Sequence, residues 1–221
     1  MAVMIRNLAA ADIAAAIDLQ HRVYKTVPAF RAEQFKSLLD HFPRGQFVAE
    51  MDGQLVGLAV SLVISWDDYS LHHTWAEVTN NGLFDTHDMG GRTLYGAEVC
   101  VDPDSRGQGV GHLLYEARRQ LCRAMNLKRI IAGGRLPGYL EHAAHMSPEE
   151  YARRVIWGDF HDPVLGFQLG EGFDYCGILH GYLHTDPDSI GNAALIVWLN
   201  PDYDPLRPTL LSPANLFEET L

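Results

Sequence analysis

The feature that most constrains the fold is an apolar segment that runs into a glycine-rich turn and then into an amphipathic helix. Residues 93–101 read as a strand, and the turn after them contains Arg106-Gly-Gln-Gly-Val-Gly111. Apolar residues then recur at positions 110, 113, 114, 117, 121 and 125, which predicts one continuous apolar helix face. Together with a further apolar run at 129–132, this order predicts a parallel strand–helix–strand unit.

The flanking segments extend this unit into a mixed α/β sheet. The elements expected before it are a strand at 3–5, helices at 10–21 and 32–40, and strands at 46–51 and 54–64. The last two strands form a hairpin, because Asp52-Gly53 suits a tight turn. The elements expected after it are a loop at 133–139, a helix from Ser147, and strands at 173–183 and 193–199. The prediction is a central sheet of about seven strands flanked by helices.

The glycine-rich turn predicts an anion site, because the free N–H groups and positive dipole end of a helix N-terminus attract phosphate. Two phosphate motifs do not match: His112 stands where the third glycine of GxGxxG belongs, and no Gly-Lys-Ser/Thr is present. What remains is Arg-x-x-Gly-x-Gly, formed by Arg106, Gly109 and Gly111. This resembles the pyrophosphate-binding motif of the GNAT superfamily, the acyl-CoA-dependent N-acyltransferases. The order of elements over residues 2–200 is also similar to the GNAT fold.

Several later segments are similar to the GNAT portion of proteins in which a GNAT domain precedes a carbon–nitrogen hydrolase (nitrilase-like) domain. The similar segments are Arg135-Leu-Pro-Gly-Tyr139, residues 162–168, Gly172-Phe173 and residues 192–201. The resemblance implies a GNAT domain over residues 1–200, with residues 66–92 inserted as a lid. Residues 201–221 carry several prolines and are expected to form an extended arm where the interdomain linker would begin. We expect no hydrolase domain within this sequence.

The resemblance implies acetyl-CoA as the cosubstrate and a sheet that is splayed at the acyl-CoA site. The residues implied to hold the CoA pyrophosphate are Arg106, Gly107, Gln108, Gly109, Val110 and Gly111. The preceding strand residues Val99, Cys100 and Val101 would lie along the pantetheine arm, which pairs with the strand backbone as an added strand.

Transfer of an acyl group to an amine requires a proton acceptor, because the amine is protonated at neutral pH. Glu98 is the first candidate for this base: it lies three residues before Val101 on the same predicted strand, where many GNAT enzymes place a carboxylate. His87 is the next candidate. A glutamate that only faces solvent is the alternative interpretation of Glu98.

The general acid is harder to identify. Many GNAT enzymes use a tyrosine five residues before the Phe of the Gly-Phe pair, but Gln168 occupies that position and cannot donate a proton in this role. Tyr139 and Tyr182 remain as candidates, and a mechanism without a dedicated acid is also open. Cys100 as a covalent nucleophile is a further alternative, although cysteines on strands are more often buried apolar residues.

Residues 66–92 are too long for a simple connection and are rich in acidic and aromatic side chains. The acidic residues are Asp67, Asp68, Glu77, Asp85 and Asp88, against the single basic residue Arg92. Because this segment leads into the strand that carries Glu98, we expect it to form the acceptor side of the site and to select a cationic amine. The alternative is a solvated acidic loop that covers the sheet edge.

The amino-acid composition disfavours some classes of partner and favours one cellular compartment. Seventeen Lys and Arg residues against 28 Asp and Glu residues give a net charge of −11, which disfavours nucleic acid as a partner. No apolar run is long enough to span a membrane, and Met1 to Leu8 do not resemble a signal peptide. Three dispersed cysteines favour a reducing compartment, so we expect a cytoplasmic protein. The pairs His142/His145 and His180/His184 lack an evident third ligand, so no metal site is predicted.

These observations favour an acyl-CoA-dependent N-acyltransferase that transfers acetyl from acetyl-CoA to a small amine by direct attack. The alternative is a non-catalytic acyl-CoA-binding module, or a partner of a separate carbon–nitrogen hydrolase. The absence of tyrosine at position 168 favours the alternative, whereas Glu98 favours the enzyme. A homodimer is one expectation for the assembly, which the sequence leaves open.

Overall fold

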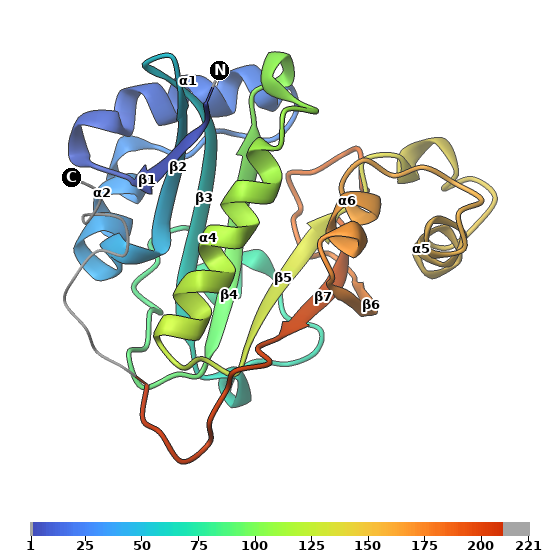
Figure 1. Ribbon diagram of the computed structural model, residues 1–221. Coiled ribbons are helices and arrows are strands. Elements are labelled where there is room, and N and C mark those ends of the chain that lie inside the picture. The colour runs from blue at the N-terminus through green and yellow to red at the C-terminus, as the bar shows by residue number, and fades with distance from the viewer. Residues whose placement is uncertain (1, 210–221) are drawn as a thin grey trace.

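The structure is a computed structural model that describes residues 2–209. Its centre is a seven-stranded mixed sheet in the order β1-β2-β3-β4-β5-β7-β6 (Figure 1). The strands are β1 (Met4–Asn7), β2 (Gln46–Met51), β3 (Gln54–Ile64), β4 (Thr93–Val101), β5 (Arg129–Arg135), β6 (Asp174–Leu179) and β7 (Ala193–Leu199). The strand count and the mixed sheet agree with the fold class predicted from the sequence.

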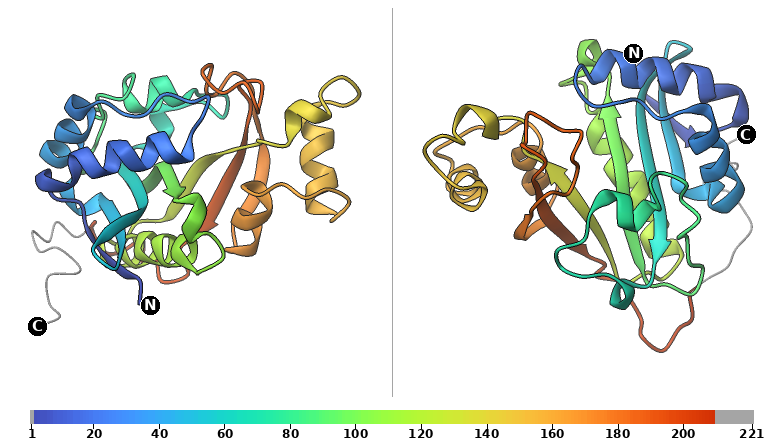
Figure 2. Two further views of the ribbon diagram at one scale, coloured as in Figure 1. Left: turned by 90° about the horizontal axis from the view of Figure 1, so that it is seen from above. Right: turned by 180° about the vertical axis from the view of Figure 1, so that it is seen from behind.

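Helices cover both faces of the sheet (Figure 2). They are α1 (Ile13–Val23), α2 (Ala32–His41), α3 (Trp75–Thr79), α4 (Val110–Ala124), α5 (Pro148–Ile156) and α6 (Leu165–Gly170). Short 3₁₀ turns occupy Ala10–Asp12, Pro43–Gly45, Trp66–Asp68, Pro103–Ser105 and Tyr139–Glu141. The two faces of β3 show why the layers form. Leu58 and Leu62 pack toward α1 and α2, whereas Ala59 and Val63 pack toward α4. Because successive side chains of a strand point to opposite faces of the sheet, β3 contributes to the apolar core on each face.

The centre of the sheet opens between two parallel strands. β4 pairs with β5 only from Thr93 to Gly96, opposite Arg129 to Ala132. Beyond these residues the two strands are no longer paired, so the later part of β4 has a free backbone edge on this side. This is the splay that the resemblance to the GNAT superfamily implied, and the two strands are connected through α4.

The ends of β5 and β6 differ from the sequence prediction. β5 continues through Gly133 and Gly134, which the sequence indicated as a loop, and both residues pair with β7. These glycines make room for other side chains: a Cβ on Gly133 would lie 2.4 Å from the Tyr182 ring, and one on Gly134 would lie 2.0 Å from the Gln168 side chain. In contrast, β6 ends at Leu179 rather than at residue 183, and the chain then turns back toward β5.

Residues 66–92 contact the central strands, because the Trp75 indole donates to the Ala97 carbonyl of β4 and the Asp88 amide donates to the Val63 carbonyl of β3. They contain α3, whose Thr74 N-cap accepts a hydrogen bond from the Glu77 amide. Of the proline-rich arm, residues 201–209 lie within the described part, and there the Asn126 side chain donates to the carbonyls of Asp204 and Arg207. The remaining residues of the expected arm lie outside the described residues. Among residues 2–209, no helix is both long and apolar enough to cross a membrane.

Candidate active site

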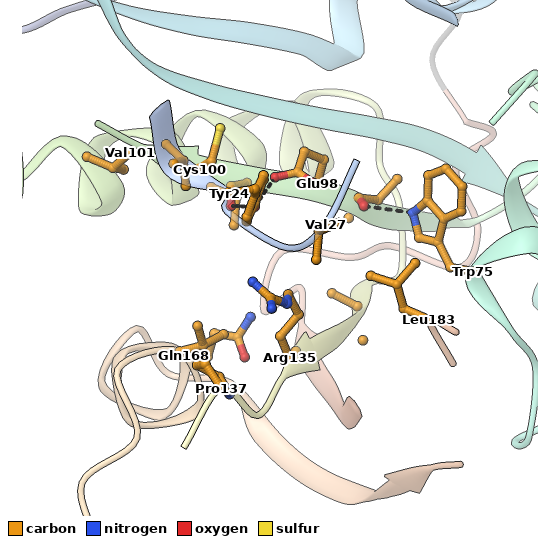
Figure 3. A pocket seen from close by; sticks show the side chains of 18 of the residues that line it. Tyr24, Val27, Trp75, Glu98, Cys100, Val101, Arg135, Pro137, Gln168 and Leu183 are labelled. Atoms are coloured by element: carbon orange, nitrogen blue, oxygen red, sulfur yellow. Dashed lines mark hydrogen bonds between the residues drawn. The ribbon is translucent and has the colours of Figure 1, made fainter. Parts of the chain in front are cut away.

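A cavity of about 580 Å³ occupies the splay between β4 and β5 (Figure 3). One wall is β4 from Gly96 to Val101, and the opposite wall is β5 from Ala132 to Arg135. The connection between α1 and α2 and the segment after β6 close one end, while the starts of α4 and α6 line the other. The cavity therefore joins the glycine-rich turn to the strand that carries Glu98.

The turn before α4 has the geometry of an anion site. Gly107 and Gly109 have φ of +74° and +81°, and a Cβ on either would meet no atom within 4 Å. The first helical hydrogen bond there runs from the Leu113 amide to the Gly109 carbonyl. The amides between these two residues therefore lack an acceptor within the helix and are available to a phosphate. Arg106 adds a positive charge at the cavity lining.

The predicted CoA-binding residues divide into two groups. Those that line the cavity are Val99, Cys100, Val101, Arg106 and Gly111, whereas Gly107, Gln108, Gly109 and Val110 do not line it. Of the second group, Val110 is a buried core residue, and the others form the exposed turn. A Cβ on Gly111 would lie 2.9 Å from the Phe167 ring, so this glycine allows α6 to pack on α4.

A β-bulge shapes the wall of the cavity. Val60 of β3 pairs with Glu98 and Ser61 pairs with Gly96, so Ala97 is the extra residue on β4. The Trp75 indole donates to the Ala97 carbonyl at 3.0 Å. From the other face, the buried Arg118 guanidinium donates to the carbonyls of Val60 and Glu98. The bulge is thus held on both sides, and it directs the residues around it into the cavity.

Glu98 is half-buried in this wall, and its Oε1 accepts a hydrogen bond of 2.5 Å from the Tyr24 hydroxyl. Burial raises the pKa of Glu98 above its ordinary value, while the Tyr24 hydrogen bond and the charges of Arg135 and Arg118 oppose that rise. The Arg135 guanidinium lies over the Tyr24 ring at 5.5 Å and is held at 2.6 Å by the buried Asp186 carboxylate. The result is a carboxylate that can take up a proton more readily than an exposed one.

Two of the catalytic candidates, His87 and Tyr139, do not line the cavity. The His87 ring stacks on Phe42 at 4.3 Å, and its Nδ1 accepts the Val63 amide at 3.0 Å. Burial also lowers the pKa of His87 to about 4. Tyr139 donates to the Met146 carbonyl at 3.2 Å. His87 comes before β4, and β4 starts five residues before Glu98. Five strand residues span about 16 Å, which separates His87 from Glu98 along the strand direction.

The acidic side chains of residues 66–92 do not line the cavity either. Asp85 accepts hydrogen bonds from the Asn80 amide, and Asp88 accepts from the Ser65 hydroxyl and the Gly90 backbone. Within this segment, Trp75 is the residue that lines the cavity. The geometry therefore gives no support to the expectation that this segment creates a negative field at the acceptor site.

Several residues of the cavity were not identified from the sequence. Arg118 carried one signal, because it follows Leu114 by four residues and so places a charge on the apolar face of α4. It is 2% exposed and donates to neutral oxygens. Tyr24 and Arg135 had no such signal, because their contacts with Glu98 and Asp186 join distant segments.

Tyr182, left open as an acid, lines the cavity and belongs to a buried hydrogen-bonded chain. Its hydroxyl lies 2.8 Å from that of Tyr95, which in turn lies 2.8 Å from Nε2 of His73. The Nδ1 of His73 is 2.8 Å from the Ser70 carbonyl, which can only accept, so Nδ1 carries the proton. With Nε2 as the acceptor, the chain runs from Tyr182 through Tyr95 to His73, and Tyr182 offers no proton to the cavity.

Among the cysteines and histidines that the sequence singled out, Cys100 lines the cavity. Cys100 and Cys122 are buried thiols, and burial raises the pKa of Cys100 well above its usual value. His180 contacts Asn192 and Glu149 rather than a second histidine. Across residues 2–209, no three His, Cys, Asp or Glu side chains are grouped so that they could hold a metal ion.

Comparisons with known proteins identify relatives of this chain. A family profile described as "Acetyltransferase (GNAT) family" matches residues 12–145. The "Uncharacterized N-acetyltransferase YkwB" of Bacillus subtilis (strain 168) is 33% identical over 208 residues, which cover 91% of this chain and 91% of YkwB. The "Probable hydrolase YhcX" of the same organism is 43% identical over 202 residues, or 91% of this chain. The match covers only 39% of YhcX, so the chain spans about two fifths of that relative.

Among solved structures, "GphF GNAT-like decarboxylase in complex with isobutyryl-CoA" has a TM-score of 0.75 and 23% sequence identity. The match covers 89% of this chain and 98% of that one, and at this identity it supports the fold. The family profile covers more than half of the chain, and YkwB is related along nearly its whole length. The chain belongs to the acetyltransferase (GNAT) family.

Proposed function

We propose that the protein transfers the acetyl group of acetyl-CoA to the amine of a small molecule, with Glu98 as the proton acceptor. The observation that carries this proposal is the position of Glu98. Glu98 lies at the β4 bulge and lines the same cavity as Tyr24 and as Arg106 and Gly111 of the glycine-rich turn. Burial raises its pKa, which suits a general base that works near neutral pH.

The donor end of the cavity suits CoA. The amides at the start of α4 and the Arg106 guanidinium would bind the pyrophosphate. Within residues 2–209, β4 has no strand partner on the β5 side beyond Gly96, so the backbone of Val99 and Val101 can pair with the pantetheine amides. The thioester would then lie near the bulge at Ala97 and Glu98. No step of this placement requires a side chain from residues 85–92.

The acceptor end suits a small molecule. Its walls include the apolar side chains of Val27, Phe30, Trp75 and Leu183 together with the polar side chains of Arg31, Gln34 and Thr185. A cavity of about 580 Å³ with mostly apolar walls is typical of small-molecule sites. A peptide acceptor would instead need an open groove.

The reaction proposed is a direct attack. The neutral amine nitrogen attacks the thioester carbonyl carbon, its proton passes to the Glu98 carboxylate, and the carbon–sulfur bond then breaks with the electron pair going to sulfur. Cys100 does not act as a covalent intermediate in this proposal, because its thiol is buried and its pKa is raised. The products are an N-acetyl compound and CoA.

The alternative is a module that binds acyl-CoA without transferring the acyl group. It is favoured by Gln168, which lines the cavity where a tyrosine would be expected, and by the similarity to YhcX, which is described as a probable hydrolase. In that case acetyl-CoA would bind, but none of the amines would release a thiol.

The test is a thiol-release assay with acetyl-CoA and a panel of small amines, run beside calorimetric titration of acetyl-CoA. We expect binding and amine-dependent thiol release, with Glu98→Gln lowering turnover by roughly 100-fold at unchanged acetyl-CoA affinity. Binding without turnover across the panel would favour the binding module. Full turnover of Glu98→Gln would place the base elsewhere.

A further inference from the structure

A tyrosine on α4 meets Gln168 at the cavity. Gln168 is 3% exposed, lies in α6 and points into the cavity from the side opposite Glu98 (Figure 3). Its Nε2 donates to the Tyr115 hydroxyl at 3.1 Å. Its Oε1 is buried and has no hydrogen-bond partner within the described residues. Tyr115 is 2% exposed and also lines the cavity, so a phenol occupies the region where the sequence indicated that no acid was present.

The polarity of this hydrogen bond determines what Tyr115 can do. A side-chain amide nitrogen can only donate, so the Tyr115 oxygen accepts and its own hydrogen points elsewhere. Within residues 2–209, the bond from Gln168 is the only hydrogen bond of the Tyr115 hydroxyl. The phenolic hydrogen is therefore available to an acceptor in the cavity. Tyr182 differs in this respect, because its hydroxyl donates its hydrogen to Tyr95.

The surroundings hold the phenol in place and keep it protonated. The Tyr115 ring packs edge-on against Phe167 and Phe173, each at 5.4 Å between ring centroids. Burial raises the pKa of Tyr115, so the hydroxyl keeps its proton at neutral pH. The Arg118 guanidinium, 5.6 Å from the ring centroid, and the Gln168 hydrogen bond both favour the phenolate once the proton has left.

We propose that Tyr115 is the general acid that protonates the departing CoA sulfur, and that Gln168 is the residue that orients its hydroxyl. This inference rests on the proposed acetyl transfer. Tyr115 follows Gly111 by about one turn on α4, so the helix that binds the pyrophosphate at its start also carries the proton donor. Gln168 thus acts by directing a phenol supplied by another helix.

In the proposed step, the departing sulfur receives both an electron pair and a proton. The carbon–sulfur bond of the tetrahedral adduct breaks, and its electron pair goes to sulfur. The Tyr115 hydroxyl gives its proton to that sulfur and becomes a phenolate, which the Gln168 amide and Arg118 stabilise. Glu98 holds the proton taken from the amine. After CoA leaves, Tyr115 regains a proton from water and Glu98 releases one to water, so no net proton is gained by the protein.

The first test measures the thiol pKa of bound CoA and does not depend on turnover. The thiol pKa of protein-bound CoA is followed by the ultraviolet absorbance of the thiolate, with the desulfo-CoA complex as the blank. A hydroxyl that donates to sulfur favours the thiolate, so we expect Tyr115→Phe to raise the bound thiol pKa by about one unit or more, a tenfold change. Equal titration curves for the two proteins would overturn the inference.

The second test is kinetic and uses matched variants. We expect Tyr115→Phe to lower kcat by roughly 100-fold with KM for acetyl-CoA within twofold. Tyr175→Phe is the control, because Tyr175 is a half-buried tyrosine of β6 that does not line the cavity. Gln168→Glu replaces the donor by an acceptor that would capture the Tyr115 hydrogen, so it should reproduce most of the loss, whereas Gln168→Met should lose less than tenfold.

The outcomes separate this inference from the proposed function. Amine-dependent turnover by the wild-type protein together with an unaffected Tyr115→Phe variant would overturn Tyr115 as the acid and leave acetyl transfer intact. An active Gln168→Glu variant beside an inactive Tyr115→Phe variant would show that the Tyr115 hydroxyl is needed but that Gln168 does not orient it, and would overturn the role given to Gln168. If no amine is acetylated, the proposed function fails, and the thiol titration still decides whether Tyr115 donates to the CoA sulfur.

Discussion

Replacing Tyr24 by phenylalanine should shift the pH dependence of the reaction in a known direction. The Tyr24 hydroxyl donates to Glu98 Oε1 at 2.5 Å, and this bond lowers the pKa of Glu98 against the effect of burial. A hydrogen bond to a charged group contributes about 1.5–3 kcal/mol, and one pKa unit corresponds to about 1.36 kcal/mol. Because Glu98 is only half-buried, solvent replaces part of the lost bond, and we expect a rise of about one unit.

The assay is the pH profile of kcat/KM for the acceptor amine in thiol release. Glu98 accepts a proton only when it is ionised, so activity is lost as the pH falls through its pKa. Removing the Tyr24 hydroxyl favours the protonated form, so the acidic limb should move to higher pH by about one unit, while activity on the plateau persists. Tyr175→Phe should leave the limb in place. A limb that stays unchanged in Tyr24→Phe, or that moves to lower pH, would refute Glu98 as the base.

Three further changes test separate parts of the account. Gly109→Asp adds a negative charge, and a side chain on a residue with φ of +81°, at the anion site, so acetyl-CoA binding measured by calorimetry should be lost; unchanged affinity would reject the site. Asp85→Asn with Asp88→Asn should leave the amine KM unchanged, because neither carboxylate lines the cavity; a raised KM would restore the acidic lid. The folded state holds the pKa of Glu98 above 4.5, so this residue's stabilising contribution falls as the pH rises from 4.5 through the raised pKa. Glu98→Gln should therefore unfold at pH 7 no earlier than the wild-type protein by circular dichroism, and earlier unfolding would contradict the raised pKa.

The parts of the fold that depend on local patterns could be predicted from the sequence. The strand, turn and helix from Thr93 to Ala124, the Asp52-Gly53 hairpin and the N-cap at Ser147 all depend on residues close together in the chain. The end of β5 could not be predicted this way. Gly133 and Gly134 suggest a loop, yet they extend the strand because their missing side chains admit Tyr182 and Gln168.

The same distinction between local and distant residues applies to the candidate site. Glu98 and the glycine-rich turn were evident, because they lie on one continuous segment. Tyr24 could not be found, since 74 residues separate it from Glu98. His87 does not line the cavity, because closeness to Glu98 in the sequence becomes distance along an extended strand. Tyr115 was hidden among the apolar positions of α4, and only the contact with Gln168, 53 residues later, sets it apart.

The most direct test of acetyl transfer is to identify both products of one reaction. Acetyl-CoA carrying an isotopically labelled acetyl group is incubated with the wild-type protein and an amine from the panel that supports thiol release, and the mixture is analysed by mass spectrometry. We expect one labelled N-acetyl product for each CoA released, and a roughly 100-fold slower appearance of both with Glu98→Gln. CoA released without an acetylated amine, or equal rates for the two proteins, would contradict the account.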